Sequence, residues 1–121
     1  MRKIRIGYLG DGIWAHGAFK KIIEDDSIEI MFVTVRYDYR DSVLMELAQN
    51  NNIPVELSSN INSDDYITLV KKYEVDLLVS MSFNQIFKEK ILKSVLSNRF
   101  TASATTHIAG QLVATHTSGL P

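Results

Sequence analysis

Residues 76–86 read DLLVSMSFNQI, and this stretch indicates the fold. Leu77, Leu78 and Val79 form a continuous apolar run that gives way abruptly to polar residues. A short run that is apolar at every position is typical of a strand buried on both faces of a parallel sheet. Ligands of open α/β sheets bind outside the carboxyl ends of such strands, so we expect a ligand near residues 82–85.

Three other apolar runs occur along the chain, and a helical pattern follows each of the four. The expected strands lie close to residues 3–9, 28–35, 54–57 and 75–82. The buried helical stripes are expected at Ala15, Ala18, Phe19, Ile22 and Ile23; Val43, Leu44, Leu47 and Ala48; Tyr66, Leu69, Val70 and Tyr73; and Phe87, Ile91, Leu92 and Val95. This alternation predicts an α/β fold with a Rossmann-like, doubly wound, mainly parallel sheet in three α-β-α layers.

Composition narrows the class of protein. The length of 121 residues suits a single domain over residues 1–121, and the net charge of −1 provides no basic field for nucleic acid or an anionic membrane. The chain has no cysteine, which excludes disulfides and thiolate chemistry and fits a cytoplasmic location. No long apolar segment is present, so neither a signal peptide nor a membrane span is expected.

Glycines lie between the first expected strand and the first expected helix, at Gly7, Gly10 and Gly12, with Asp11 between the last two. Glycine lets the backbone approach a ligand at the positive N-terminus of a helix. The spacing reverses the usual dinucleotide fingerprint, although some dehydrogenases use this variant for a nicotinamide cofactor. The alternative is a tight strand-to-helix turn that binds no ligand.

A polar and aromatic cluster, RYDYR, follows the second expected strand at residues 36–40. A dinucleotide site would use an acid here for a ribose or an arginine for a 2′-phosphate, so Arg36 and Asp38 keep that alternative open. Tyr37 and Tyr39 also fit ordinary loop packing. In the next segments, Asp41 or Ser42 is expected to cap the second helix, and residues 62–65 the third.

The strings SMSFNQI (residues 80–86) and IRIGYLGDGIWAH (residues 4–16) resemble the N-terminal half of folate-dependent formyltransferases. The likeness covers roughly residues 3–93 and is strongest to the members that formylate a nucleotide-linked amino sugar; the wider group includes methionyl-tRNA formyltransferase. It implies transfer of a formyl group from 10-formyl-tetrahydrofolate to the amino group of such a sugar.

The resemblance also implies where each ligand binds. It places the pterin of the folate against one loop, largely through main-chain groups: Ser82, Phe83, Asn84, Gln85 and Ile86. It places the sugar acceptor against the other polar segments: Gly10, Asp11, Gly12, Trp14, His16, Arg36 and Tyr37. Within that second set, His16 can face a ligand phosphate or be an ordinary surface residue.

The likeness fails in residues 101–121, an atypical tail without Asp, Glu, Lys or Arg. Formyltransferases carry Asn-x-His here, followed by Leu-Pro, Arg-Gly and a later Asp; the Asn and His stabilise the oxyanion. His107 and His116 are the two candidate catalytic histidines, but the Asn position holds Thr105 or Ala114. We therefore expect this chain not to catalyse formyl transfer. Truncation, a change of reading frame or natural divergence would each explain the incomplete motif. No carboxylate or thiolate accompanies the two histidines, so no metal site is expected.

Two other functions stay open. One is a nicotinamide-binding Rossmann module that uses Gly7, Gly10, Gly12 and Arg36, and the other is a non-catalytic domain that binds a sugar nucleotide or a folate. The expected partners are small molecules, a folate and a nucleotide-linked amino sugar, with no nucleic acid and no membrane. An uncovered sheet edge also predicts a homo-oligomer.

Overall fold

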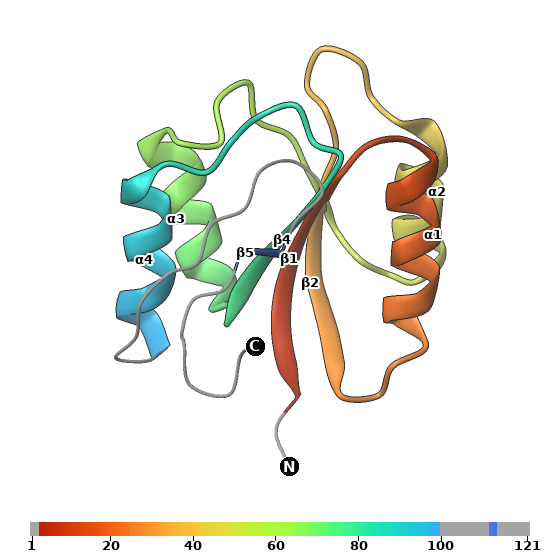
Figure 1. Ribbon diagram of the computed structural model, residues 1–121, viewed down its shortest axis with the longest axis horizontal. Helices are drawn as coiled ribbons and strands as arrows, with labels where there is room; N and C mark the ends of the chain where they lie inside the picture. The colour runs from red at the N-terminus through yellow and green to blue at the C-terminus, as the bar shows by residue number, and fades with distance from the viewer. Residues whose placement is uncertain (1–2, 100–111, 114–121) are drawn as a thin grey trace.

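The computed structural model describes residues 3–99 and 112–113. Strands and helices alternate along this part of the chain (Figure 1). The elements are β1 (Ile4–Gly10), α1 (Gly12–Ile23), β2 (Ile28–Thr34), α2 (Ser42–Asn50), β3 (Val55–Glu56), α3 (Asp64–Tyr73), β4 (Leu77–Met81), α4 (Glu89–Arg99) and β5 (Leu112–Val113). None of these described helices has both the length and the apolar character needed to cross a membrane.

The strands form one sheet in the order β3-β2-β1-β4-β5. Strands β1, β2, β3 and β4 pair with one another in parallel. The short β5 pairs antiparallel with β4. The predicted α/β class and mainly parallel sheet are therefore confirmed. The strand boundaries differ from the prediction by at most two residues, and β4 ends at Met81 because Ser82 turns into the left-handed region with φ of 56°.

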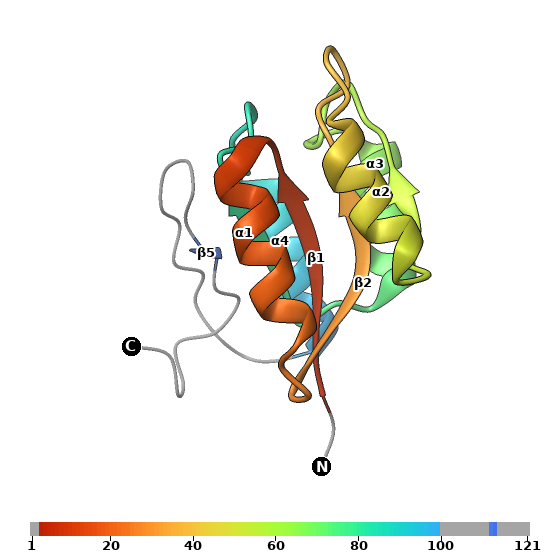
Figure 2. The same cartoon turned by 90° about the vertical axis from the view of Figure 1, so that its right-hand side faces the viewer.

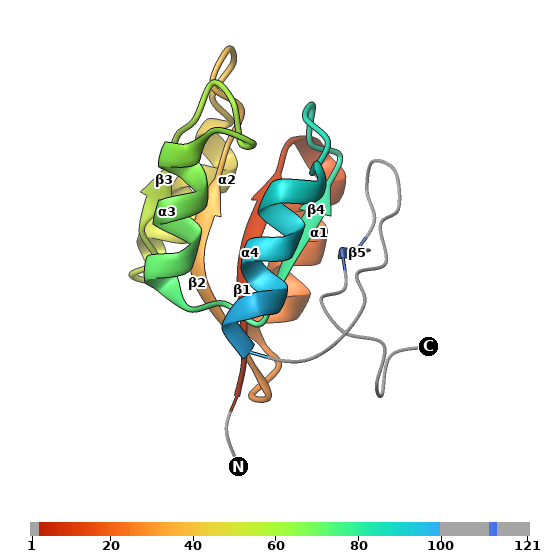
Figure 3. The ribbon, with the colours of Figure 1, turned by 90° about the vertical axis from the view of Figure 1, so that its left-hand side faces the viewer.

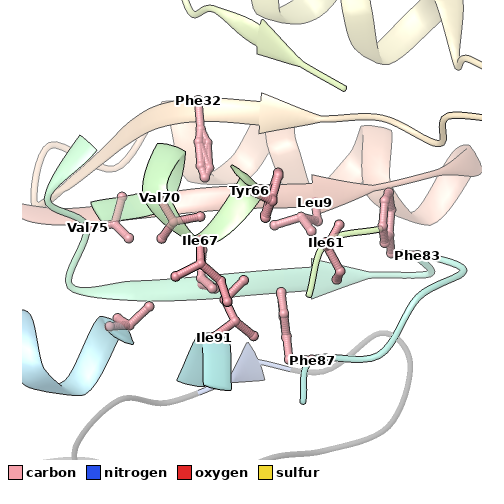
Figure 4. Close-up of a cluster of buried hydrophobic side chains, with 12 residues drawn as sticks. Leu9, Phe32, Ile61, Tyr66, Ile67, Val70, Val75, Phe83, Phe87 and Ile91 are labelled. Atoms are coloured by element: carbon pink, nitrogen blue, oxygen red, sulfur yellow. The ribbon is translucent and has the colours of Figure 1, made fainter. Parts of the chain in front are cut away.

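Helices cover both faces of the sheet. Helices α1 and α2 lie on one face (Figure 2), and α3 and α4 lie on the other (Figure 3). Each face has its own buried cluster of apolar side chains, and β4 contributes to both, with Leu77 and Val79 in one and Leu78 in the other. The cluster under α3 and α4 also contains Phe83 and Phe87 from the segment after β4 (Figure 4). Burial on both faces explains why β4 is apolar at successive positions.

The pairing of β1 with β2 shifts register between Ile6 and Gly7, and this shift places Phe32 opposite Gly7. A Cβ atom on Gly7 would lie 2.4 Å from the Phe32 ring, which is closer than real Cβ contacts allow. The same ring packs against Tyr66 and Tyr73. Gly7 is therefore required by packing inside the sheet, and its place in a dinucleotide fingerprint has a purely structural explanation.

Local capping predictions agree with the structure. The Asp41 side chain accepts hydrogen bonds at the start of α2, and Ser63 Oγ accepts one from Tyr66 N (3.2 Å) at the start of α3. Val43, however, was expected in the buried stripe of α2 and is 46% exposed, so that assignment is wrong. Leu44 and Ala48 face the sheet instead, and Val43 lies one helical position, about 100°, away from Leu44.

Candidate functional site

The carboxyl ends of β1, β2 and β4 meet at one edge of the sheet, the upper edge in Figure 1. Asp11 N donates a hydrogen bond to Met81 O (3.1 Å), which joins the end of β1 to the end of β4. The glycine loop after β1 therefore lies beside the start of the segment that the resemblance assigns to folate. The loop after β2 reaches the same edge through Asp41, which bonds to Gly12 N (2.8 Å).

Asp41 is the central acceptor at this edge. One carboxylate oxygen accepts from Gly12 N (2.8 Å) and bonds to His16 Nε2 (2.6 Å), and the other accepts from Val43 N (3.0 Å) and Leu44 N (3.1 Å). Burial acts to raise the pKa of Asp41, but the hydrogen bonds from Gly12, Leu44 and His16 outweigh it and hold the pKa below its ordinary value. One carboxylate thus caps α2 and binds the start of α1.

Sequence reasoning identified Asp41 only as a helix cap and did not include it in the site. The missed contacts reach back 29 residues to Gly12 and 25 residues to His16. A capping aspartate at the start of a helix gives a local signal, but no local signal shows that its second oxygen binds another helix. The contact has a chemical consequence, because a carboxylate now lies at the start of α1, where a dinucleotide-binding fold places its pyrophosphate.

His16 has a structural partner. Its side chain is 19% exposed and is held against Asp41, so it is neither an open surface residue nor a free phosphate ligand in this arrangement. Trp14, two residues earlier on α1, is 75% exposed. The two residues that the resemblance groups together therefore differ in environment, one half-buried and paired, the other open to solvent.

Asp11 precedes α1 at the capping position, but its side chain makes no capping hydrogen bond. Its nearest opposite charge is Arg36 Nη1, 3.9 Å from Asp11 Oδ2. Burial raises the pKa of the Asp11 carboxyl, Arg36 opposes this, and the charges of Asp41 and Asp38 add to it. Asp11 is therefore a carboxylate at the ligand-binding edge whose hydrogen-bonding capacity is not used by the helix that it begins.

Arg36 is engaged by its neighbour. Its Nε donates to Asp38 Oδ1 (3.0 Å) and its Nη2 to Asp38 Oδ2 (2.7 Å), a two-point pair that raises the pKa of Arg36 further. Tyr37 is 52% exposed and Tyr39 is 73% exposed. The Arg40 guanidinium lies over the Tyr37 ring, 6.0 Å from its centroid, so the loop-packing interpretation describes Tyr37 in part, whereas Tyr39 is mostly exposed.

The two other glycines of the loop have different environments. A Cβ on Gly10 would lie 2.7 Å from the Ala15 Cβ, so Gly10 lets α1 approach the end of β1. Gly12 has φ of +84°, a conformation that side-chain-bearing residues rarely adopt, and among residues 3–99 and 112–113 a Cβ there would meet nothing within 4 Å. Gly12 is thus the glycine of this loop above which the space is open.

The segment after β4, residues 82–88, is tied to the loop that precedes α3. Gln85 Oε1 accepts from Ile61 N (2.9 Å), and Gln85 Nε2 donates to Ser58 O (3.3 Å). Asn62 makes the reciprocal contacts: its Nδ2 donates to Ile86 O (2.9 Å), and its Oδ1 accepts from Lys88 N (2.7 Å). Four hydrogen bonds from two amide side chains therefore hold this segment in one conformation.

The five residues assigned to folate fall into two groups: those with side chains already used by the fold, and those that are exposed. The Phe83 side chain is buried in the core cluster, and the Gln85 side chain is used by the Ser58 and Ile61 main chain. Ser82, Asn84 and Ile86 are exposed. Asn62 was predicted only as part of a helix cap, and its role in holding residues 86–88 is visible only in the structure.

Both candidate catalytic histidines, His107 and His116, lie outside the described residues, as do Thr105 and Ala114. Among residues 3–99, no group of three or more His, Asp or Glu side chains is arranged to hold a metal ion. The described part of the site thus contains the two loops assigned to ligands and none of the residues assigned to catalysis.

Comparison with known proteins adds no relative: no protein-family model matches the chain, and no curated protein matches it.

Proposed function

We propose that this chain is a Rossmann-like, doubly wound domain of a folate-dependent formyltransferase. In this proposal 10-formyl-tetrahydrofolate binds against residues 82–86. The acceptor, a nucleotide-linked amino sugar, places the amino group of its sugar, not its diphosphate, at Asp11, beside Gly10, Gly12 and Arg36. The support is the sequence likeness at two separated segments, which the parallel sheet brings to one edge. The absence of cysteine fits a cytoplasmic location for such an enzyme.

The observation that carries the proposal is the backbone of Ser82. Its φ of 56° is left-handed, which costs a residue with a side chain on the order of 1–2 kcal/mol. Such strain persists where the surroundings over-determine it, and it is concentrated at ligand sites. Here the hydrogen bonds of Gln85 and Asn62 hold the following residues, so the loop is formed before any ligand arrives.

The exposed groups of this loop suit a flat heterocycle with several hydrogen-bonding atoms. Within the described residues, the main-chain groups of Phe83 and Asn84 make no hydrogen bond. Because the side chains of Phe83 and Gln85 are already used by the fold, recognition would rely on this main chain and on Asn84. A pterin edge presents alternating donors and acceptors, which main-chain N–H and C=O groups can match.

On the acceptor side, the carboxylate of Asp11, whose nearest cation is Arg36 at 3.9 Å, suits an amino group. An ammonium is attracted to a carboxylate that is partly removed from water, and Asp11 makes no capping hydrogen bond that would compete. Tyr37, which is half exposed with the Arg40 guanidinium 6.0 Å from its ring centroid, offers a stacking surface for a nucleoside base at the same edge.

The nicotinamide alternative is less well supported. A dinucleotide would need its pyrophosphate at the start of α1, where the Asp41 carboxylate already accepts from Gly12 N. It would also need Arg36 for a 2′-phosphate, but Asp38 already occupies two of its donors.

The test is calorimetry with 5-formyl-tetrahydrofolate, a stable analogue of the donor. We expect weak binding that is lost in Asn84→Ala and in Ser82→Trp, while Ser82→Gly, which adopts the same φ without strain, retains it. Asn50→Ala, another exposed asparagine far along α2, is the matched control and should bind as the parent does. Binding of NADH or NADPH without any folate binding would overturn the proposal.

A further inference from the structure

A cavity lies along α1, on the side of the helix that faces the end of β4. Its volume is about 500 Å³, and six residues line it: Ile13, Trp14, Gly17, Ala18, Lys21 and Met81. Five of them come from successive turns of one face of α1, and Met81 is the last residue of β4. The cavity therefore runs from the ligand-binding edge of the sheet along the length of a helix.

Two large apolar side chains are exposed at its upper end. Ile13 is 77% exposed and Trp14 is 75% exposed. An exposed tryptophan next to an exposed isoleucine is unfavourable in water, and such a patch beside a cavity commonly marks a contact surface. Nothing in the packing of the described residues requires an indole at this position.

Gly17 lines the cavity and is an unexpected residue for the interior of α1. A glycine inside a helix destabilises it by roughly 1 kcal/mol relative to alanine. A Cβ on Gly17 would meet no atom of the described residues within 4 Å, so no side chain or backbone in that part of the protein requires the glycine. Its missing side chain is explained if another molecule approaches the helix backbone here.

Lys21 supplies the one charge in the lining. It follows Trp14 by seven residues, close to two helical turns, so the two side chains share a face and their Cα atoms are separated by about 10 Å along the axis. A ligand that stacks on the indole and extends down the helix would bring its far end to the ammonium group of Lys21.

We infer that this cavity binds a planar ring that carries an anionic group, with the ring against Trp14 over Gly17 and the anion at Lys21. Resting on the proposed function, two sources have this chemistry: the aminobenzoyl-glutamate part of the folate donor, and the base and diphosphate of the acceptor. Met81 lines the cavity and directly precedes Ser82, the first residue of the proposed pterin site. This adjacency favours the folate as the source of the ring and the anion.

The chain offers a direct readout, since Trp14 is its only tryptophan. A nitrogen-15 NMR spectrum has one indole N–H signal, and we expect p-aminobenzoyl-glutamate to shift it in a saturable manner. Thymidine diphosphate is titrated in parallel, and the probe that binds more tightly identifies the source. Uncharged p-aminobenzamide should bind less tightly than p-aminobenzoyl-glutamate, because it lacks the anion that Lys21 would attract.

Two variants test the roles of lining residues, and a third, outside the lining, is the control. By calorimetry, Trp14→Ala should weaken binding roughly tenfold to a hundredfold, the usual range for loss of a stacked ring. Lys21→Gln should weaken binding of the anionic probe but leave the uncharged probe unaffected. Lys20→Gln, the neighbouring exposed lysine that does not line the cavity, is the matched control and should change neither.

Gly17→Ala separates a ligand role from a structural one. It should raise the midpoint of thermal unfolding by about 2–5 °C, because alanine is the better helix former. It should also weaken probe binding about tenfold, because a methyl group enters the cavity. A stabilised variant that binds both probes as well as the parent does would overturn the inference.

The outcome is separable from that of the proposed function. If 5-formyl-tetrahydrofolate binds in a manner that depends on Asn84 while the indole signal of Trp14 does not move, this inference is wrong and the proposed function stands. If thymidine diphosphate shifts the signal and no folate binds, the inference stands and the proposed function fails. A signal that moves with protein concentration alone would assign this face to a second copy of the chain and overturn the inference.

Discussion

Asp41 connects three parts of the chain at the scale of single residues: the start of α1, the side chain of His16 and the first turn of α2. Asn at this position would keep one acceptor oxygen but would turn a donor toward Gly12 N or His16. We expect Asp41→Asn to lower the free energy of unfolding in urea by about 1–3 kcal/mol. Asp38→Asn removes an exposed acid from the same loop and should cause almost no change; equal effects of the two variants would contradict this role for Asp41.

The same carboxylate gives a pH dependence with a defined sign. The pKa of Asp41 is lower in the folded protein than its ordinary value, so its contribution to stability is fully present above the unfolded pKa, about 3.9, and is lost as the pH falls through the folded value. We expect the difference in unfolding free energy between the parent and Asp41→Asn to close below about pH 4. The measurement is urea unfolding of the parent and Asp41→Asn at a series of pH values on either side of about pH 4.

At the scale of elements, four hydrogen bonds from Gln85 and Asn62 join the loop before α3 to the loop after β4, and we call this connection the clamp. Asn62→Ala removes the hydrogen bonds to Ile86 O and Lys88 N, and we expect it to destabilise the fold by about 1 kcal/mol. The amide of Lys88 should exchange with solvent faster, as measured by hydrogen-exchange NMR. Under the proposed function, binding of 5-formyl-tetrahydrofolate should also weaken, since the loop is less well held.

Asn84→Ala is the matched control for this element. Its side chain is exposed and is not part of the clamp, so stability and the exchange of the Lys88 amide should stay at the parent values while folate binding is lost. If the two asparagine variants affect stability equally, Asn62 does not act as a clamp.

At the scale of the whole molecule, the prediction concerns whether the chain catalyses formyl transfer. Formyl transfer needs a preorganised donor for the oxyanion, and the position that resembles the family's Asn holds Thr105 before His107 or Ala114 before His116. We expect no measurable transfer from 10-formyl-tetrahydrofolate to thymidine-diphosphate amino sugars. Restoring the amide in the correct register, by Thr105→Asn or by Ala114→Asn, should bring transfer into the measurable range, because one oxyanion donor contributes about two to three orders of magnitude in rate.

These two variants also discriminate between the histidines. A gain in Thr105→Asn alone assigns catalysis to His107, and a gain in Ala114→Asn alone assigns it to His116. Robust turnover by the parent chain would contradict the prediction and would direct attention to Asp11, a carboxylate whose pKa is raised by burial, as the proton acceptor.

The sequence by itself determined the α/β class, the mainly parallel sheet and the approximate strand boundaries. It did so because burial on both faces leaves nearly continuous apolar runs in strands such as β2 and β4, and because caps such as Ser63 act within one helical turn. Both signals are local, so they can be read from neighbouring residues.

Only the tertiary structure decided which polar groups are free at the ligand-binding edge. Asp41 lies 29 residues after Gly12, and Asn62 lies 26 residues before Lys88, so neither contact follows from a local pattern. The register shift that places Phe32 over Gly7 depends on how two strands pair. Hydrogen bonds between distant loops depend on how the elements pack in three dimensions, and that packing determines which side chains are used by the fold and which are left for a ligand.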